Sequence, residues 1–85
     1  MPKRGIDYIL DVFEYIRMNG IENEVDIKTL NNAIQLNVGF THAIINKYFT
    51  SMKNLNLIQP LGEGKFKINW DEIERIKKSI KNKSE

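Results

Sequence analysis

The chain has 85 residues, no cysteine, one histidine and a formal net charge of +2. A chain this short forms one domain with a modest core, and without cysteine it forms neither disulfides nor thiolate metal sites. A lone histidine does not make a zinc site, and the N-terminal sequence lacks the long apolar run of a signal peptide or membrane span. We therefore expect a soluble, cytoplasmic protein without metal or cofactor, stabilised further by oligomerisation.

The charges are unevenly distributed along the chain. Residues 7–26 hold six acidic side chains and one arginine, residues 27–69 hold five lysines and one glutamate, and residues 75–83 hold five cations and no acid. One explanation of this pattern is that the protein has two solvated faces of opposite charge. The other is that its basic side binds the phosphates of a nucleic acid.

Residues 1–5 are predicted to be a flexible basic arm, and residues 6–19 a first helix that Asp7 caps and Gly20 ends. The apolar arc of this helix is wide, because Tyr8, Val12 and Tyr15 extend the core-facing stripe sideways. Either the last helix or a second subunit is expected to cover the extra flank.

The acidic connection after Gly20 is predicted to include a short edge strand, because Val25 and Ile27 alternate with charged residues. A short second helix follows over residues 28–37, with Thr29 as a candidate N-cap. Its predicted core residues are Leu30, Ala33, Ile34 and Leu36.

A turn containing Gly39 separates this helix from the next, with Val38 and Phe40 expected to fill the corner between them. Residues 41–56 are predicted to be a long helix capped by Thr41. Its apolar stripe comprises Ile44, Ile45, Tyr48, Phe49, Met52 and Leu55. The opposite face comprises His42, Ala43, Asn46, Lys47, Thr50, Lys53 and Asn54, without a carboxylate. Such a face suits a groove lined by phosphates and base edges.

Residues 57–69 are predicted to be a two-stranded hairpin with Glu63 at its glycine-flanked tip. Alternation places Phe66 inward and Lys65 and Lys67 outward. The lysines would either bind phosphate or protect a sheet edge.

Residues 71–82 are predicted to form the last helix, with Asp71 and Glu74 spaced as a capping box. Ile73, Ile76 and Ile80 form a narrow apolar stripe, typical of a seam against another helix.

Residues 26–69, in which a long basic helix runs into a glycine-rich hairpin, resemble the winged helix-turn-helix superfamily. Small archaeal, viral and plasmid winged-helix DNA-binding proteins are similar in length and in their added C-terminal helix. The resemblance implies a mostly helical α+β fold with a three-helix core, a two-stranded wing and an extra helix.

The resemblance also implies that the third helix enters the major groove of double-stranded DNA and that the wing touches the backbone. Asn46 would read adenine, Lys47 would read guanine or hold phosphate, and Thr41 would bind phosphate. The full set of implied DNA contacts is Thr41, His42, Asn46, Lys47, Thr50, Lys53, Lys65 and Lys67.

These observations predict a sequence-specific, homodimeric transcriptional regulator that is associated with the nucleoid. The dimer interface is predicted to comprise Tyr8, Val12, Tyr15, Ile73, Ile76 and Ile80. A winged-helix module that binds protein, and a chromatin or plasmid-maintenance protein that binds DNA with little sequence preference, are the alternatives. No catalytic constellation and no small-molecule ligand is evident, since Asp7, Asp11 and Glu14 fit an ordinary exposed acidic stripe.

Overall fold

The computed structural model describes residues 5–83, so the predicted arm lies outside the described residues except for Gly5, which begins the first helix. In chain order the elements are α1 Gly5–Met18, β1 Glu24–Asp26, α2 Ile27–Asn37, α3 His42–Asn54, β2 Ile58–Gly62, β3 Lys65–Ile68 and α4 Trp70–Lys83. The described part is therefore a small α+β fold of four helices and one three-stranded antiparallel sheet. None of these helices is long and apolar enough to cross a membrane.

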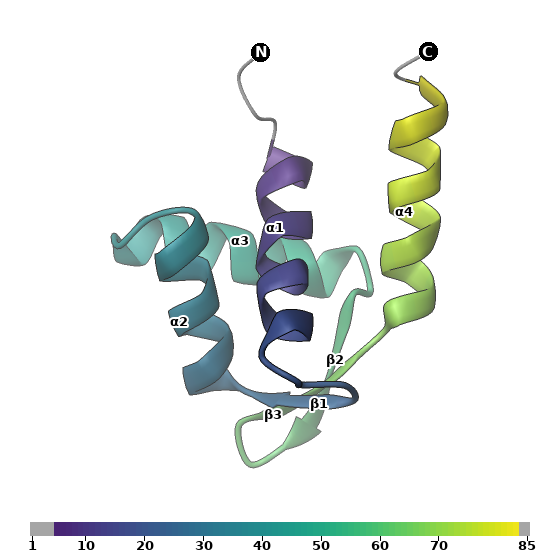
Figure 1. Ribbon diagram of the computed structural model, residues 1–85. Coiled ribbons are helices and arrows are strands. Elements are labelled where there is room, and N and C mark those ends of the chain that lie inside the picture. Colours follow the sequence, from purple (N-terminus) through teal and green to yellow (C-terminus); the bar gives the residue numbers. More distant parts are fainter. Residues whose placement is uncertain (1–4, 84–85) are drawn as a thin grey trace.

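The helices stand over the sheet (Figure 1). α2, α1 and α4 lie side by side, α3 crosses behind α1, and the strands lie below them. The strand order is β1-β3-β2, so β3 is the central strand. The predicted two-stranded hairpin is present, and β1 adds a third strand to it, because Val25 of β1 pairs with Phe66 of β3. Ile27, expected in this strand, instead begins α2.

One hydrophobic core joins all seven elements. Its fully buried members include Phe13 of α1, Leu30 of α2, Met52 of α3 and Ile73 of α4. The described residues include no buried polar or charged side chain.

Two helices end in the same backbone motif. After α1 the N–H of Gly20 donates to Arg17 O at 3.0 Å and that of Ile21 donates to Ile16 O at 3.3 Å. This is a Schellman ending, and Gly20 adopts the positive φ of 79° that the motif requires. Asn56 takes the same place after α3 with a φ of 60°, so α3 ends two residues earlier than predicted.

The helix starts confirm one predicted cap and correct three. Thr41 caps α3 as predicted, since its Oγ1 accepts the N–H of Ile44 at 3.2 Å. α2 is capped by Asp26 rather than Thr29. Asp7 and Asp71 lie inside the first turns of α1 and α4, and each helix begins one residue earlier than expected.

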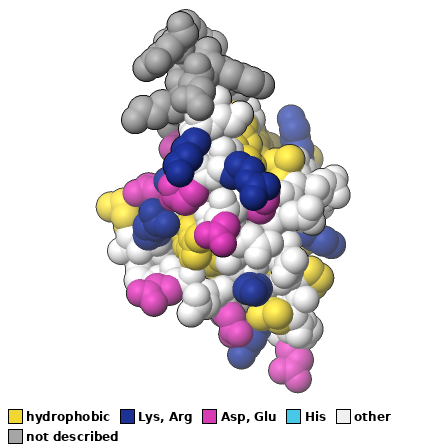
Figure 2. All heavy atoms as spheres, turned by 90° about the vertical axis from the view of Figure 1, so that its right-hand side faces the viewer, with side chains coloured by type: hydrophobic (Ala, Val, Ile, Leu, Met, Phe, Trp, Pro, Cys, Tyr) yellow, Lys and Arg dark blue, Asp and Glu magenta, His cyan; other side chains and the backbone are white. Residues whose placement is uncertain are grey.

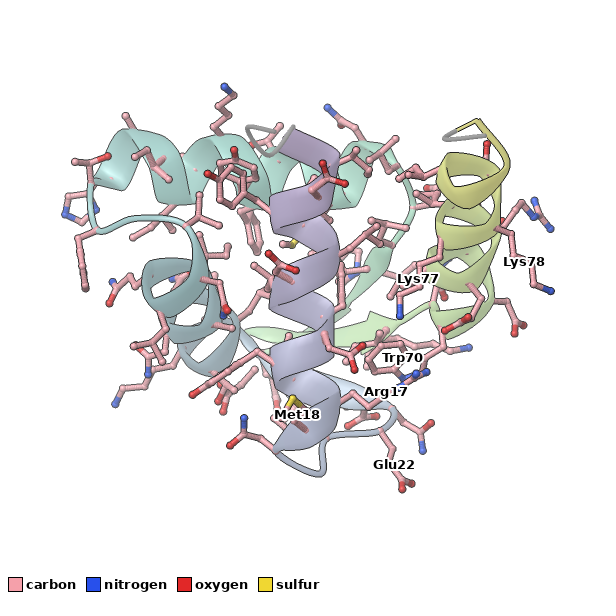
Figure 3. The ribbon with its side chains drawn as sticks, turned by 45° about the horizontal axis from the view of Figure 1, so that its top comes forward. Arg17, Met18, Glu22, Trp70, Lys77 and Lys78 are labelled. Atoms are coloured by element: carbon pink, nitrogen blue, oxygen red, sulfur yellow. The ribbon has the colours of Figure 1, made fainter. Side chains whose placement is uncertain are left out.

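α4 is tied to the C-terminal half of α1. The rings of Phe13 and Trp70 meet edge to face with centroids 6.0 Å apart, and the Arg17 guanidinium lies 4.7 Å from the Trp70 ring centroid. Arg17 also lies 3.6 Å from Glu74, and Lys77 lies 3.3 Å from Glu14. Figure 3 shows Arg17 and Lys77 between the two helices, whereas the neighbouring Lys78 points away.

The side of the molecule formed by α4 carries charges of both signs, with hydrophobic side chains showing between them (Figure 2). These charges largely neutralise each other, because the ion pairs between α1 and α4, and that of Arg75 with Glu72 at 2.9 Å, lie here. This side therefore offers no continuous surface of one sign.

Candidate nucleic-acid interface

The face of α3 that points away from the core is the strongest candidate for a nucleic-acid interface. We call this surface the outer face of α3; it comprises His42, Ala43, Asn46, Lys47, Thr50, Lys53 and Asn54, and every one of these residues is exposed. The core is reached by the other side of the helix, where Ile45 and Met52 are buried. Helical spacing thus separates the two faces as predicted.

The charges on this face are not neutralised by neighbouring carboxylates. No aspartate or glutamate occurs anywhere between residues 27 and 62. None of the ion pairs between described side chains involves Lys47 or Lys53. Instead the Lys47 ammonium lies 5.9 Å from the Tyr48 ring centroid, and that of Lys53 lies 5.7 Å from the Phe49 ring centroid. Both cations are available to an anionic partner.

The middle of the outer face offers hydrogen-bonding groups that the fold does not use. No hydrogen bond among the described residues engages the side-chain amide of Asn46 or the hydroxyl of Thr50. A free carboxamide presents a donor and an acceptor side by side, which matches the edge of adenine in the major groove. The side-chain amide of Asn46 is therefore free to make the base contact that the sequence predicts for it.

The N-terminus of α3 is held by a tight turn. The N–H groups of Val38 and Gly39 both donate to Ile34 O, at 2.8 and 3.3 Å. A Cβ on Gly39 would lie 2.9 Å from Ile44 Cδ1, so glycine allows the turn to approach α3 closely. The Oγ1 of Thr41 accepts its capping bond, which leaves the hydroxyl proton free to donate.

The hairpin lysines are placed differently from the prediction. Lys65 and Lys67 do point outward, but they stand opposite Asp26 and Glu24 in the register of β1 with β3. Opposite charges at facing positions stabilise a sheet and reduce the positive potential above it. Because β3 is the central strand, protection of a sheet edge does not explain these lysines either.

The hairpin tip is attached to α2, not to α3. The N–H of Ile27 donates to Gly64 O at 2.7 Å, which fixes the tip beside the first residue of α2. The rings of Phe49 and Phe66 meet at 5.2 Å inside the fold. The outer face of α3 and the outer face of β3 therefore point away from a shared interior. The structure does not join the two lysine groups into one surface.

Two apolar residues near α3 are exposed against expectation. Phe40, predicted to fill the corner between helices, is 77% exposed, and Leu36, predicted to face the core, is 62% exposed. The corner is filled by Val38, which packs against the core. One sequence signal fits this outcome: Phe40 is adjacent to the cap Thr41 in a turn of only a few residues, too short to direct both Val38 and Phe40 inward. Leu55, the last member of the apolar stripe, is also exposed.

The predicted dimer residues do not lie on one surface. Val12 and Ile73 have no exposed area, so they belong to the core of the chain and leave nothing for a partner to contact. The Tyr8 ring packs against the Tyr48 ring of α3, with centroids 6.3 Å apart. Tyr15 is two turns further along the same side of α1, and α4 contacts a different side through Glu14 and Arg17. Only Ile76 and Ile80 remain together, half-buried on α4.

No group of three or more potential metal ligands occurs among residues 5–83. Comparisons of the chain with protein-family models, with curated proteins and with solved structures returned no match. The case for a function therefore depends on the geometry and charge of the chain's own surface.

Proposed function

We propose that this protein is a winged helix-turn-helix protein that binds double-stranded DNA sequence-specifically and regulates transcription without catalysing a reaction. The observation that carries the proposal is the outer face of α3, where seven exposed residues include two unneutralised lysines and no carboxylate. α2 and α3 joined by the Gly39 turn give the order of helices that such a protein needs. A cytoplasmic, nucleoid-associated location belongs to the same proposal.

In this proposal the N-terminal half of α3 enters the major groove. Asn46 reads a base, His42 and Thr50 contact the groove on either side of it, and Thr41 donates to a phosphate. Lys47 and Lys53 hold the backbone and make the affinity depend on salt. Lys65 and Lys67 contribute less than the sequence suggested, because Asp26 and Glu24 stand beside them.

The proposal keeps the homodimer but reduces its interface to α4. Trp70, Glu74 and Lys77 of α4 contact α1. Ile76 and Ile80 follow the same stripe and are half-buried within the chain. Pairing of two such stripes would cover them and place two copies of α3 on one face of a palindromic site.

A second candidate is a module that binds another protein. The specific observation in its favour is the exposure of two apolar residues, Phe40 just before the N-terminus of α3 and Leu36 in the last turn of α2. Aromatic side chains anchor many protein interfaces. The neighbouring outer face of α3 is polar and cationic, which favours nucleic acid over an apolar protein surface.

Incubating the protein with a random duplex pool at two salt concentrations, followed by sequencing of the retained DNA, tests the proposal. A regulator enriches a palindrome and loses affinity steeply with salt. Salt-dependent retention without enrichment indicates a chromatin or plasmid-maintenance protein instead. Absence of retention at low salt excludes DNA binding, and the protein-binding module then becomes the leading candidate.

A further inference from the structure

Phe40 is exposed to solvent in a turn whose backbone is fixed by hydrogen bonds on both sides. Among the exposed large hydrophobic residues of the described part of the chain, only Met18 is more exposed. The two N–H groups that bond to Ile34 O fix the residues before Phe40, and the capping bond of Thr41 fixes the residue after it. Covering this benzyl group with a partner is favourable, because it removes apolar surface from water, and the fixed turn leaves little backbone to be ordered on binding.

The position of Phe40 relates it directly to the outer face of α3. It directly precedes the cap residue Thr41, so it lies at the same end of the helix as His42 and Ala43. In helix-turn-helix complexes this end of the helix lies deepest among the base edges. An apolar group there meets the one apolar feature of the major groove, the 5-methyl group of thymine.

We propose that Phe40 is a specificity-determining residue that contacts a thymine methyl group at the edge of the DNA site read by α3. This inference rests on the proposed DNA-binding function. Leu36, the penultimate residue of α2, is a second exposed apolar side chain close in sequence to the same turn. The preferred site accordingly carries thymine near the base that Asn46 reads.

The charge around Phe40 argues for DNA over a protein as the occupant. The chain has three lysines and no acid between residues 27 and 62, the segment that includes the turn and both flanking helices. The first turn of α3 contains no acidic residue, so its amide N–H groups add positive potential next to the ring. An apolar protein patch would leave these groups without partners, whereas DNA phosphates flank every groove.

The test uses the duplex that the pool selection retains, with each thymine replaced in turn by uracil. Uracil keeps the base pair and removes only the methyl group. At one position the affinity of the unaltered protein should fall about fourfold, the effect of uncovering one methyl group. Phe40→Ala should bind the thymine duplex more weakly and should no longer distinguish thymine from uracil at that position.

Met18→Ala is the matched control, because Met18 is exposed to a similar extent, 79%, but ends α1, outside both the helix-turn-helix and the wing. It should bind like the unaltered protein and keep the uracil effect. If no thymine position responds, or if Phe40→Ala still responds, the inference is overturned while DNA binding stands. If no duplex is bound at all, both proposals fail; if a protein partner then requires Phe40, the ring serves the second candidate function.

Discussion

The carboxylate of Asp26 accepts a hydrogen bond from the backbone N–H of Thr29 at 2.7 Å. One residue thereby ends β1 and caps α2, so the sheet and the first helix of the proposed helix-turn-helix share a fixed joint. Hydrogen bonds from Thr29 lower the pKa of this carboxyl below its ordinary value, and the charges of Lys28 and Lys65 lower it further.

The first prediction concerns the stability of this joint at low pH. A lowered pKa in the folded state means that the ionised cap stabilises the fold above the pKa of the unfolded chain, which is about 4. This contribution is lost as the pH falls through the lower folded value. In urea unfolding, Asp26→Asn keeps a capping oxygen without the charge, so it should be less stable than the unaltered protein at pH 7, and the difference should vanish in strong acid. An equal difference at both pH values would show that the charge plays no part.

The second prediction concerns the end of α3. Asn56 has a φ of 60°, a conformation that costs a residue with a Cβ roughly 1 kcal/mol or more unless it is asparagine or glycine. Asn56→Gly should therefore preserve or raise the free energy of unfolding, and Asn56→Ala should lower it by about 1 kcal/mol. Asn54→Ala, at an exposed helical position two residues earlier, is the control and should stay within about 0.5 kcal/mol. A similar loss in both alanine variants would contradict the argument.

Much of the fold could be predicted because it depends on local chemistry. The stripe of α3, the cap at Thr41, the ending at Gly20 and the inward direction of Phe66 each follow from a few neighbouring residues. The pairing of Val25 with Phe66 could not be located, because the two are far apart in sequence and three residues give little alternation to detect. That pairing also moved the cap from Thr29 to Asp26, since the strand ends where the helix begins.

Of the candidate site, only the exposure of the polar face of α3 could be predicted from the sequence. Exposure of the polar face follows from helical periodicity, whereas the surroundings of Lys65 and Lys67 depend on β1. Leu36, placed in the core by helical spacing, and Phe40, placed in the corner between helices, were both misassigned, because apolar residues near a helix end look like core residues until the turn is known. For the wide apolar arc of α1 the sequence left open whether the last helix or a second subunit covers the extra flank; in the structure Tyr8 of that arc packs against Tyr48 of α3, and Val12 is fully buried.

The third prediction concerns the hairpin tip. Glu63 and Gly64 have φ values of 54° and 74°, the two positive angles of a type I′ turn. Asparagine is preferred over glutamate at the first of these positions, so Glu63→Asn should stabilise the protein by several tenths of a kcal/mol in thermal or urea unfolding. Glu63→Val is the opposite control, because a β-branched residue is strained at positive φ. Equal stability of all three proteins would mean that the tip is not ordered as described.

The last prediction separates base reading from backbone contact on the outer face of α3. Asn46 and Lys53 are both exposed and lie seven residues, or two turns, apart. On the selected duplex, Asn46→Ala should cost about 1–3 kcal/mol of binding free energy and relax the preference at one base pair. Lys53→Ala should weaken all duplexes alike and make the dependence on salt shallower, because one fewer counterion is released. Lys78→Ala, whose side chain points away from the fold on α4, is the control and should leave both properties unchanged. If Asn46→Ala lowered binding to every sequence equally, the amide would be holding the backbone, and base recognition would have to come from another residue of the face.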